Sequence, residues 1–350
     1  PASRWRSPPD GRCASNPAKT SRISEPLRFD DLPPPPPAGA PPPVRPGSWG
    51  IAVLLFALTF FTTTTLGGIF AVVSRTDLTT DLGLFLTPAT VRAVWTEPAL
   101  LAWGLSFALP TLVILLAHEL GHWFACRRHA LPATPPYFIP APLGLGTFGA
   151  FIRIRAAIRG KRQLLDVGVS GPIAGFLVLL PFLVWGVARS QPVTLAVTGD
   201  LDASAVWLYR PGSNLLTTLV VTALHGSRAV DTLNPHPFLL AAWVGMFATM
   251  LNLLPLAQLD GGHVLYAAAG RWQRRLAWPL WAALALLGLR WPGWWVWCGI
   301  VLVLGLRHPP VLDERSPLDR RGRWLVATAA LIFALCFLPV PIRIVALLGE

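Results

Sequence analysis

The sequence predicts an all-α polytopic membrane protein with about seven transmembrane helices. Of the 350 residues, 53% are hydrophobic and only 13% are charged, whereas about a quarter of the residues in soluble domains are charged. The apolar residues gather in runs long enough to cross a bilayer as helices, and most arginines and lysines lie between these runs. Such alternation is typical of a chain that crosses a membrane several times.

The first 48 residues differ from the rest of the chain. They are rich in proline, with runs at 33–37 and 41–43, and they show no hydrophobic periodicity. This composition favours a disordered, partly polyproline II arm, which we expect to be a tether without a specific partner. Residues 49–350 are then expected to form one membrane-embedded domain.

Seven apolar runs follow the arm. They are residues 49–73, 99–126, 167–188, 237–256, 276–289, 291–306 and 324–348. The fifth and sixth runs are short and flank Arg290, so they form either two spans or one hairpin that does not fully cross the membrane. Segment 189–236, between the third and fourth runs, is expected to be an extramembrane loop.

The charges of the loops orient these spans. Arginine and lysine concentrate in the arm and in segments 127–162, 270–275 and 307–323, whereas segments 74–98 and 189–236 hold fewer. By the positive-inside rule, the richer segments and the N-terminus are cytoplasmic. We therefore expect a multi-pass membrane protein with a cytoplasmic N-terminus, and its expected location is a bacterial inner (plasma) membrane. The net charge of +12 is spread over these loops rather than gathered in one patch, so no nucleic-acid partner is predicted.

The second apolar run contains the sequence His118-Glu119-Leu120-Gly121-His122. On a helix, side chains four residues apart lie on one face, and two histidines at this spacing with a glutamate between them are typical of a zinc site with its general base. Polar side chains inside a bilayer are costly and usually functional. The motif therefore predicts zinc chemistry within the membrane, in its cytoplasmic half.

A catalytic zinc needs a third protein ligand and an open position for water. Asp260 follows the fourth run, which also ends on the cytoplasmic side, so the two motifs reach a similar depth. Pro255 interrupts helical hydrogen bonding, and Gly261 and Gly262 allow unusual backbone angles, so we expect an unwound chain that directs Asp260 inward. Two alternatives stay open: Asp260 caps a turn at the membrane surface, or His263 is the ligand.

These motifs together resemble the site-2 protease family of intramembrane zinc metalloproteases, over about residues 49–312. The resemblance rests on HELGH at 118–122 and NLLPLAQLDGG at 252–262, and it extends to GPIAG at 171–175 and TFGAF at 147–151. The threonine-rich first run and the sequence PYFIP at 136–140 are similar to the bacterial, cyanobacterial and chloroplast branch. Segment 189–236 is too short for a typical PDZ domain.

The resemblance implies a function and a set of site residues. It implies that His118, His122 and Asp260 bind one zinc ion per chain, that Glu119 is the catalytic glutamate and that Asn252 lies near the active site. It also implies a three-helix catalytic core within about residues 99–265. The expected activity is hydrolysis of peptide bonds in a membrane-protein substrate that contributes a transmembrane helix.

Such a substrate must unwind before hydrolysis, which exposes peptide groups at a cost of several kcal/mol each in lipid. An edge strand would offset this cost with new backbone hydrogen bonds. Residues 152–155 alternate isoleucine with arginine, which is a strand period. We therefore expect a membrane-dipping β-hairpin whose strand at about 146–155 holds the substrate. The alternative is a surface hairpin with its arginines at the lipid headgroups.

Two further expectations concern packing and function. Gly171, Pro172 and Gly175 in the third run should let that helix pack closely against the helices that carry the metal ligands.

Two other classes of function compete with a protease. A transporter would show internal repeats and charged residues along a transport pathway, and neither is evident in the sequence. A metal-binding protein without catalysis is a third class, but it would have no use for Glu119. The sequence does not identify the oligomeric state or the substrate.

Overall fold

The computed structural model describes residues 47–75, 86–192, 206–226, 233–311, 313–314 and 316–347. These residues all belong to the second of two compact units, which comprises residues 41–350. The arm expected over residues 1–48 lies outside the described residues, except that the first helix already begins at Gly47.

Three long helices match the first three apolar runs. They are α1 (Gly47–Arg75), α3 (Pro98–Arg128) and α4 (Lys161–Arg189). Within the described part of the chain these are the helices long and apolar enough to cross a membrane. Between α1 and α3 lies the short helix α2 (Pro88–Thr96), whose Thr87 cap accepts a hydrogen bond from the backbone of Thr90 at 3.2 Å.

The helices of the C-terminal half are shorter than the predicted spans. They are α6 (Pro237–Asn252), α7 (Asp260–Ala269), α8 (Trp272–Leu287), α9 (Gly293–Leu304) and α10 (Arg320–Cys336). The two runs around Arg290 thus form two separate helices. The expectation of seven long spans is not confirmed, because α6 to α10 each have fewer than the roughly 20 residues that a bilayer requires.

The prediction for the last apolar run is wrong beyond Cys336. The helix ends there, and strand β6 (Ile342–Leu347) follows. Pro339 and Pro341 remove two backbone donors and stop the helix, and the β-branched residues after them favour an extended chain. Strand β6 pairs antiparallel with β4 (Val206–Pro211).

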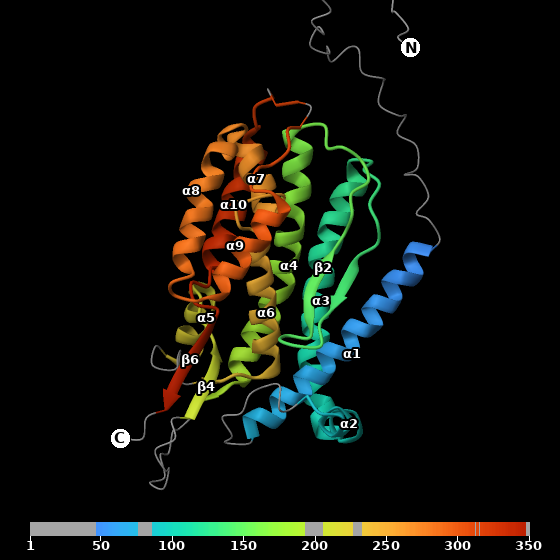
Figure 1. The fold of residues 1–350 in the computed structure, drawn as a ribbon, viewed down its shortest axis with the longest axis vertical. Coiled ribbons are helices and arrows are strands. Elements are labelled where there is room, and N and C mark those ends of the chain that lie inside the picture. The colour runs from blue at the N-terminus through green and yellow to red at the C-terminus, as the bar shows by residue number, and fades with distance from the viewer. Residues whose placement is uncertain are drawn as a thin grey trace, which may run out of the picture. The chain divides into compact units, whose positions relative to one another are not determined.

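The segment expected to be an extramembrane loop, 189–236, contains regular structure where it is described. Besides β4 it holds helix α5 (Leu215–His225) and the two-residue strands β3 (Gln191–Pro192) and β5 (Leu233–Asn234), which pair with each other. In Figure 1, α5 and β4 lie at the lower end of the helices together with β6, whereas the turn between α7 and α8 lies at the upper end.

A hairpin follows α3. Strand β1 (Tyr137–Pro140) pairs antiparallel with β2 (Thr147–Phe151), so that Tyr137 lies opposite Phe151. The register shifts between Phe138 and Pro140. The expected strand at about 146–155 is present only over Thr147–Phe151, and it runs beside α3 and α1 (Figure 1). Residues 152–155, whose alternation predicted the strand, form only an isolated bridge between Ile154 and Ala133.

Small residues set the helix crossings in the centre of the bundle, where α3, α4 and α6 pack together (Figure 1). A Cβ on Gly121 of α3 would lie 2.4 Å from the carbonyl oxygen of Ser170 on α4, and one on Gly186 would lie 2.3 Å from the backbone nitrogen of Leu239 on α6. Such close approach is typical of helices that associate in lipid.

The outer faces of the long helices carry large apolar side chains. Leu109 and Phe124 of α3 are 51% and 62% exposed, and Leu177 and Trp185 of α4 are 60% and 54% exposed. A soluble protein rarely exposes so extensive an apolar surface. Lipid as the surrounding solvent explains it, in agreement with the predicted membrane protein.

Candidate metal centre

Helix α3 carries His118 and His122 on one face, one turn apart. Both side chains are buried, at 4% and 7% exposure, and their Nε2 atoms lie 3.1 Å from each other. The imidazole Nδ1 of His122 lies 2.7 Å from the carbonyl oxygen of Val167 on α4. Donation to this carbonyl leaves Nε2 of His122 unprotonated and free to bind a metal.

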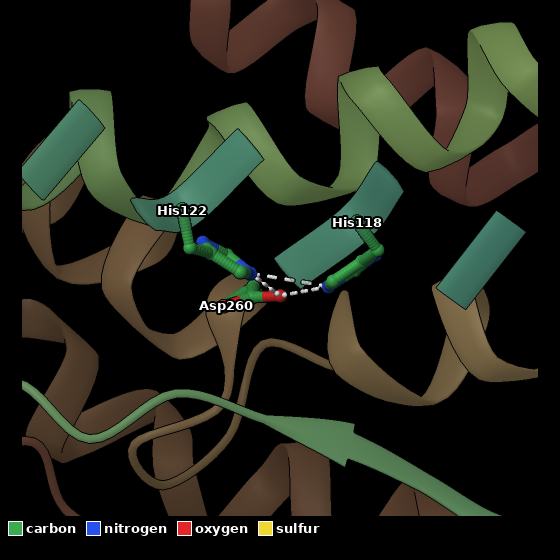
Figure 2. Close-up of side chains that lie close together, drawn as sticks. All are labelled: His118, His122 and Asp260. Atoms are coloured by element: carbon green, nitrogen blue, oxygen red, sulfur yellow. Dashed lines mark hydrogen bonds and ion pairs between the residues drawn. The ribbon is translucent and has the colours of Figure 1, made fainter. Parts of the chain in front are cut away.

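Asp260, the first residue of α7, completes a group of three. Its Oδ2 lies 3.2 Å from Nε2 of His118 and 3.2 Å from Nε2 of His122. The three side chains come from two helices far apart in the sequence and point toward a common centre (Figure 2). These distances oppose the alternative in which Asp260 caps a turn at the membrane surface.

The chemistry and spacing of these atoms fit a zinc ion. Two imidazole nitrogens and one carboxylate oxygen are a common donor set for catalytic zinc. With metal–ligand bonds of about 2.0–2.1 Å, tetrahedral ligands lie about 3.3–3.4 Å apart, and the three separations found here are 3.1, 3.2 and 3.2 Å. Three protein ligands leave one tetrahedral position open.

The local charge also favours a cation at this point. Asp260 and Glu119 are both carboxylates, with Asp260 15% exposed and Glu119 5% exposed. Among the described residues, no arginine or lysine forms an ion pair with either of them. Because a buried carboxylate is costly without a positive partner, a divalent cation between them would stabilise the site.

The chain before Asp260 is unwound, as predicted, but the two glycines after it have another role. Helix α6 ends at Asn252, a turn segment follows in which Ala257 has a φ of +54°, and α7 begins at Asp260. Gly261 and Gly262 lie inside the first turn of α7 rather than in an unwound segment. At Gly261 a Cβ would lie 2.0 Å from the carbonyl oxygen of Leu253, so this glycine is needed for close backbone packing.

Helix α4 leaves room for the two imidazoles. A Cβ on Gly171 would lie 2.1 Å from Nε2 of His122, and one on Gly175 would lie 3.2 Å from Cβ of His118. The expected packing of the third run against the helices that carry the metal ligands is therefore confirmed, and its glycines lie directly beside the ligand side chains.

The remaining predicted site residues lie beside the three ligands. Glu119 is next to His118 on α3, and its carboxylate interacts with the backbone N–H of Ile152, just after β2. Asn252 is the last residue of α6, and its Nδ2 lies 3.3 Å from Nε2 of His118. The competing ligand, His263, is not one of the three grouped residues.

His263 instead pairs with a residue that the sequence analysis did not single out. Its Nδ1 lies 2.7 Å from Nε2 of His308, which follows α9. His308 is 4% exposed and stacks on the ring of Tyr266, at a centroid distance of 4.5 Å. No spacing rule links residues 45 positions apart, and the carbonyl of Val167 carries no side-chain signal at all, so both interactions were out of reach of sequence reasoning.

Comparison with known proteins finds a peptidase family and several zinc metalloproteases that are similar to this chain. The profile of peptidase family M50 matches residues 106–285, which include every residue of the candidate site. The sequence is 32% identical over 228 residues to the probable zinc metalloprotease EGY1, chloroplastic, of Oryza sativa subsp. japonica, covering 63% of this chain and 38% of that protein. It is 31% identical over 250 residues to the protein of the same name from Arabidopsis thaliana, covering 68% and 43%.

A third relative is the probable zinc metalloprotease EGY2, chloroplastic, of Arabidopsis thaliana, which is 33% identical over 188 residues, covering 53% of this chain and 32% of that protein. The chain thus spans about two fifths of the length of the EGY1 proteins that it matches. The relatives are named as chloroplastic, which does not support the expectation of a bacterial inner membrane.

Proposed function

Because this chain belongs to peptidase family M50, whose profile matches more than half of its length, we propose that it is an intramembrane zinc metalloendopeptidase. It hydrolyses peptide bonds in or near the transmembrane segments of other membrane proteins. One observation carries the proposal: His118, His122 and Asp260 converge beside Glu119, and the two histidines and the glutamate lie within a helix apolar enough to cross a membrane.

In this proposal each site residue has a separate role. His118, His122 and Asp260 hold one zinc ion, which when bound lowers the pKa of a coordinated water toward 7 and polarises the substrate carbonyl. Glu119 accepts the proton of the attacking water and passes it to the leaving amine. The amide of Asn252 donates a hydrogen bond to the substrate carbonyl oxygen, and Val167 holds the ring of His122 in its metal-binding tautomer.

The β1–β2 hairpin is proposed to dip into the membrane. It exposes apolar side chains, with Leu143 of the turn 60% exposed and Phe148 of β2 77% exposed. Thr62, near the middle of the span Trp49–Ala71, donates a hydrogen bond of 2.7 Å to the carbonyl oxygen of Gly146. A Cβ on Gly146 would lie 2.4 Å from Cα of Thr63. Contact with the centre of a spanning helix supports a position of the hairpin within the bilayer rather than at its surface.

The same hairpin is proposed to hold the unwound substrate. Strand β2 pairs only with β1 among the described residues, so its other edge can accept a further strand. Its end lies beside Glu119 through the backbone of Ile152. A substrate strand on this edge would therefore bring its peptide bonds next to the catalytic glutamate.

Proline at Phe151 tests this role, because it removes one backbone donor from the strand. We expect Phe151→Pro to lower the cleavage of a single-span test substrate by at least about tenfold. Phe151→Ala, which keeps the backbone N–H, is the matched control for loss of the side chain. Equal cleavage by the proline and alanine variants would reject the role of the strand.

About seven membrane crossings are proposed for residues 49–350, made by α1, α3, α4, α6 with α7, α8, α9 and α10. The shorter helices would be accommodated by local thinning of the bilayer or by their neighbours. By the loop charges, the arm and the α7–α8 turn lie on the cytoplasmic side. The positive-inside pattern gives an orientation and does not identify the membrane, and the relatives named above are chloroplastic.

The central test is the variant Glu119→Gln in the full chain, expressed with a single-span substrate. We expect cleavage to fall by about 10²–10⁴-fold, the contribution of a general base, while the zinc content of the purified protein is unchanged. Glu97→Gln is the matched control, because Glu97 is an exposed glutamate just before the same helix. Equal cleavage by both forms would reject the role of Glu119. Cleavage by neither form while zinc is bound would reject the protease assignment and would favour a transporter or a non-catalytic metal protein.

A further inference from the structure

A second cluster of polar side chains lies where α7 meets α8, and this turn lies at the upper end of the helices in Figure 1. It surrounds a cavity of about 700 Å³ that is lined by the first residue of α4, the turn between α7 and α8, and Glu314. Its charged and aromatic lining residues are Lys161, Arg271, Trp272, Arg275 and Glu314. None of these residues belongs to the candidate metal centre.

The cavity carries an excess of positive charge. Its single carboxylate, Glu314, is engaged by two groups: the hydroxyl of Tyr266 donates a hydrogen bond to it, and Nε of Arg271 lies 3.6 Å from it. Within the described part of the chain, Lys161 and Arg275 form no ion pair. The guanidinium of Arg275 lies over the ring of Trp272 at 4.6 Å, which orients it without neutralising it.

The backbone adds to the preference for an anion. Lys161 is the first residue of α4, whose Gly160 cap provides no side-chain acceptor and whose first turn holds no acidic residue. The first turn itself therefore brings no negative charge to the positive end of this helix, and Asp313 lies beside the cap, where its backbone bridges Gly160. Gly270 has a φ of +58°, and a Cβ at this position would lie 3.3 Å from Nζ of Lys161, so the turn and the lysine lie against each other.

One flank of the cavity is apolar. Trp272 and Leu276 are four residues apart on α8 and therefore lie on one face, at 60% and 40% exposure. The same face continues to Leu286, which is 66% exposed. An exposed tryptophan beside arginines at the end of apolar helices is typical of the interface between lipid and water. A ligand with an anionic head and apolar chains would match both parts of this surface.

We propose that the cavity formed by Lys161, Arg271, Trp272 and Arg275 binds the phosphate of an anionic phospholipid, whose acyl chains lie along Trp272 and Leu276 of α8. The site does not depend on the proposed protease activity. It does connect segments that hold the metal centre. Helix α7 has Asp260 at its other end, and α4 carries Val167 and Gly171 about two and three turns after Lys161. A bound lipid would join α4 to the α7–α8 turn.

The test measures lipid binding by the purified full chain in a neutral detergent, with phosphatidylglycerol carrying a fluorescent acyl chain. We expect phosphatidylglycerol to bind more tightly than phosphatidylcholine with the same label. Each cation near a membrane surface contributes about fivefold in affinity, so Lys161→Gln combined with Arg275→Gln should weaken phosphatidylglycerol binding about 25-fold. Arg275→Lys, which keeps the charge, should retain most of the affinity.

The matched control is Arg128→Gln, which removes an exposed charge at the cytoplasmic end of α3, outside the cavity. We expect its affinity to stay within about twofold of the parent. Equal losses in Arg128→Gln and in the double variant would overturn the proposal in favour of a diffuse surface charge. Displacement of the lipid by equimolar inorganic phosphate would also overturn it, because the acyl chains would then contribute nothing. The melting temperature of each variant in detergent shows whether it is folded. If the double variant is unfolded, Arg275→Lys decides the test, because loss of lipid binding in this charge-keeping variant would overturn the proposal.

Discussion

Gly171→Ala is expected to disturb the metal centre through a single methyl group. The added Cβ would lie 2.1 Å from Nε2 of His122, whereas ordinary van der Waals contacts begin at 3.4 Å. The imidazole or helix α4 must therefore move by about 1.3 Å, the difference between these two distances. Movement of the ring would also strain its hydrogen bond to the carbonyl oxygen of Val167.

The size of the effect follows from this displacement. A misplacement of about 1 Å at an active site can lower the rate about 10²-fold, and overpacking of a buried position costs about 1–3 kcal/mol. We expect Gly171→Ala to reduce cleavage of a test substrate about 100-fold and to weaken zinc binding about 10–100-fold, as loss of correct ligand orientation does.

Gly175→Ala supplies the matched control. It makes the same substitution one turn further along α4, where the added Cβ would lie 3.2 Å from Cβ of His118, a contact that a small adjustment relieves. Zinc per chain would be measured against a competing chelator, and cleavage with a single-span substrate. If Gly171→Ala kept its zinc and its activity while Gly175→Ala lost them, the geometry of the site described here would be refuted.

Three further predictions concern other contacts. Asp260→Asn keeps the shape of the side chain and removes its charge, so zinc affinity in chelator competition should fall by more than about tenfold; unchanged affinity would exclude Asp260 as a ligand. Thr62→Val removes the hydrogen bond to Gly146 and should lower cleavage, whereas Thr328→Val, whose hydroxyl donates to the carbonyl oxygen of Trp324 in its own helix, should not. Arg162 and the backbone N–H of Gly322 lower the pKa of Asp319, so its stabilisation is present above about pH 4 and is lost as the pH falls through the lowered native pKa. The melting temperature should drop more for Asp319→Ala than for Asp319→Asn, which keeps the cap of α10, and that difference should vanish if the cap is unimportant.

Local sequence was sufficient for the long helices and for the histidine pair. The apolar run at 99–126 became α3 with ends within two residues of the prediction, because a long apolar segment has few alternatives to a helix in lipid. The spacing of His118 and His122 places them on one face of any helix. The helix and the histidine pair both depend on residues that are close together in the sequence.

The C-terminal half shows where local patterns fail. Apolar composition predicted a span over 324–348, but two prolines stop the helix and the next residues pair with β4. The glycines after Asp260 were interpreted as a means of unwinding the chain. Glycine is required at both positions because the carbonyl oxygens of Leu253 and Ala257 leave no room for a Cβ. No pattern in the sequence indicates that these carbonyl groups lie so close.

The sequence by itself determined that the chain belongs in a membrane and that one helix presents two histidines and a glutamate, because composition and helical periodicity are local properties. Only the tertiary structure decided that Asp260 lies 3.2 Å from both imidazoles, that Val167 orients one of them and that Gly171 leaves space for it. These contacts join α3, α4 and α7 across many residues, and they exist only because small residues let the helices approach closely enough for their side chains to share one centre.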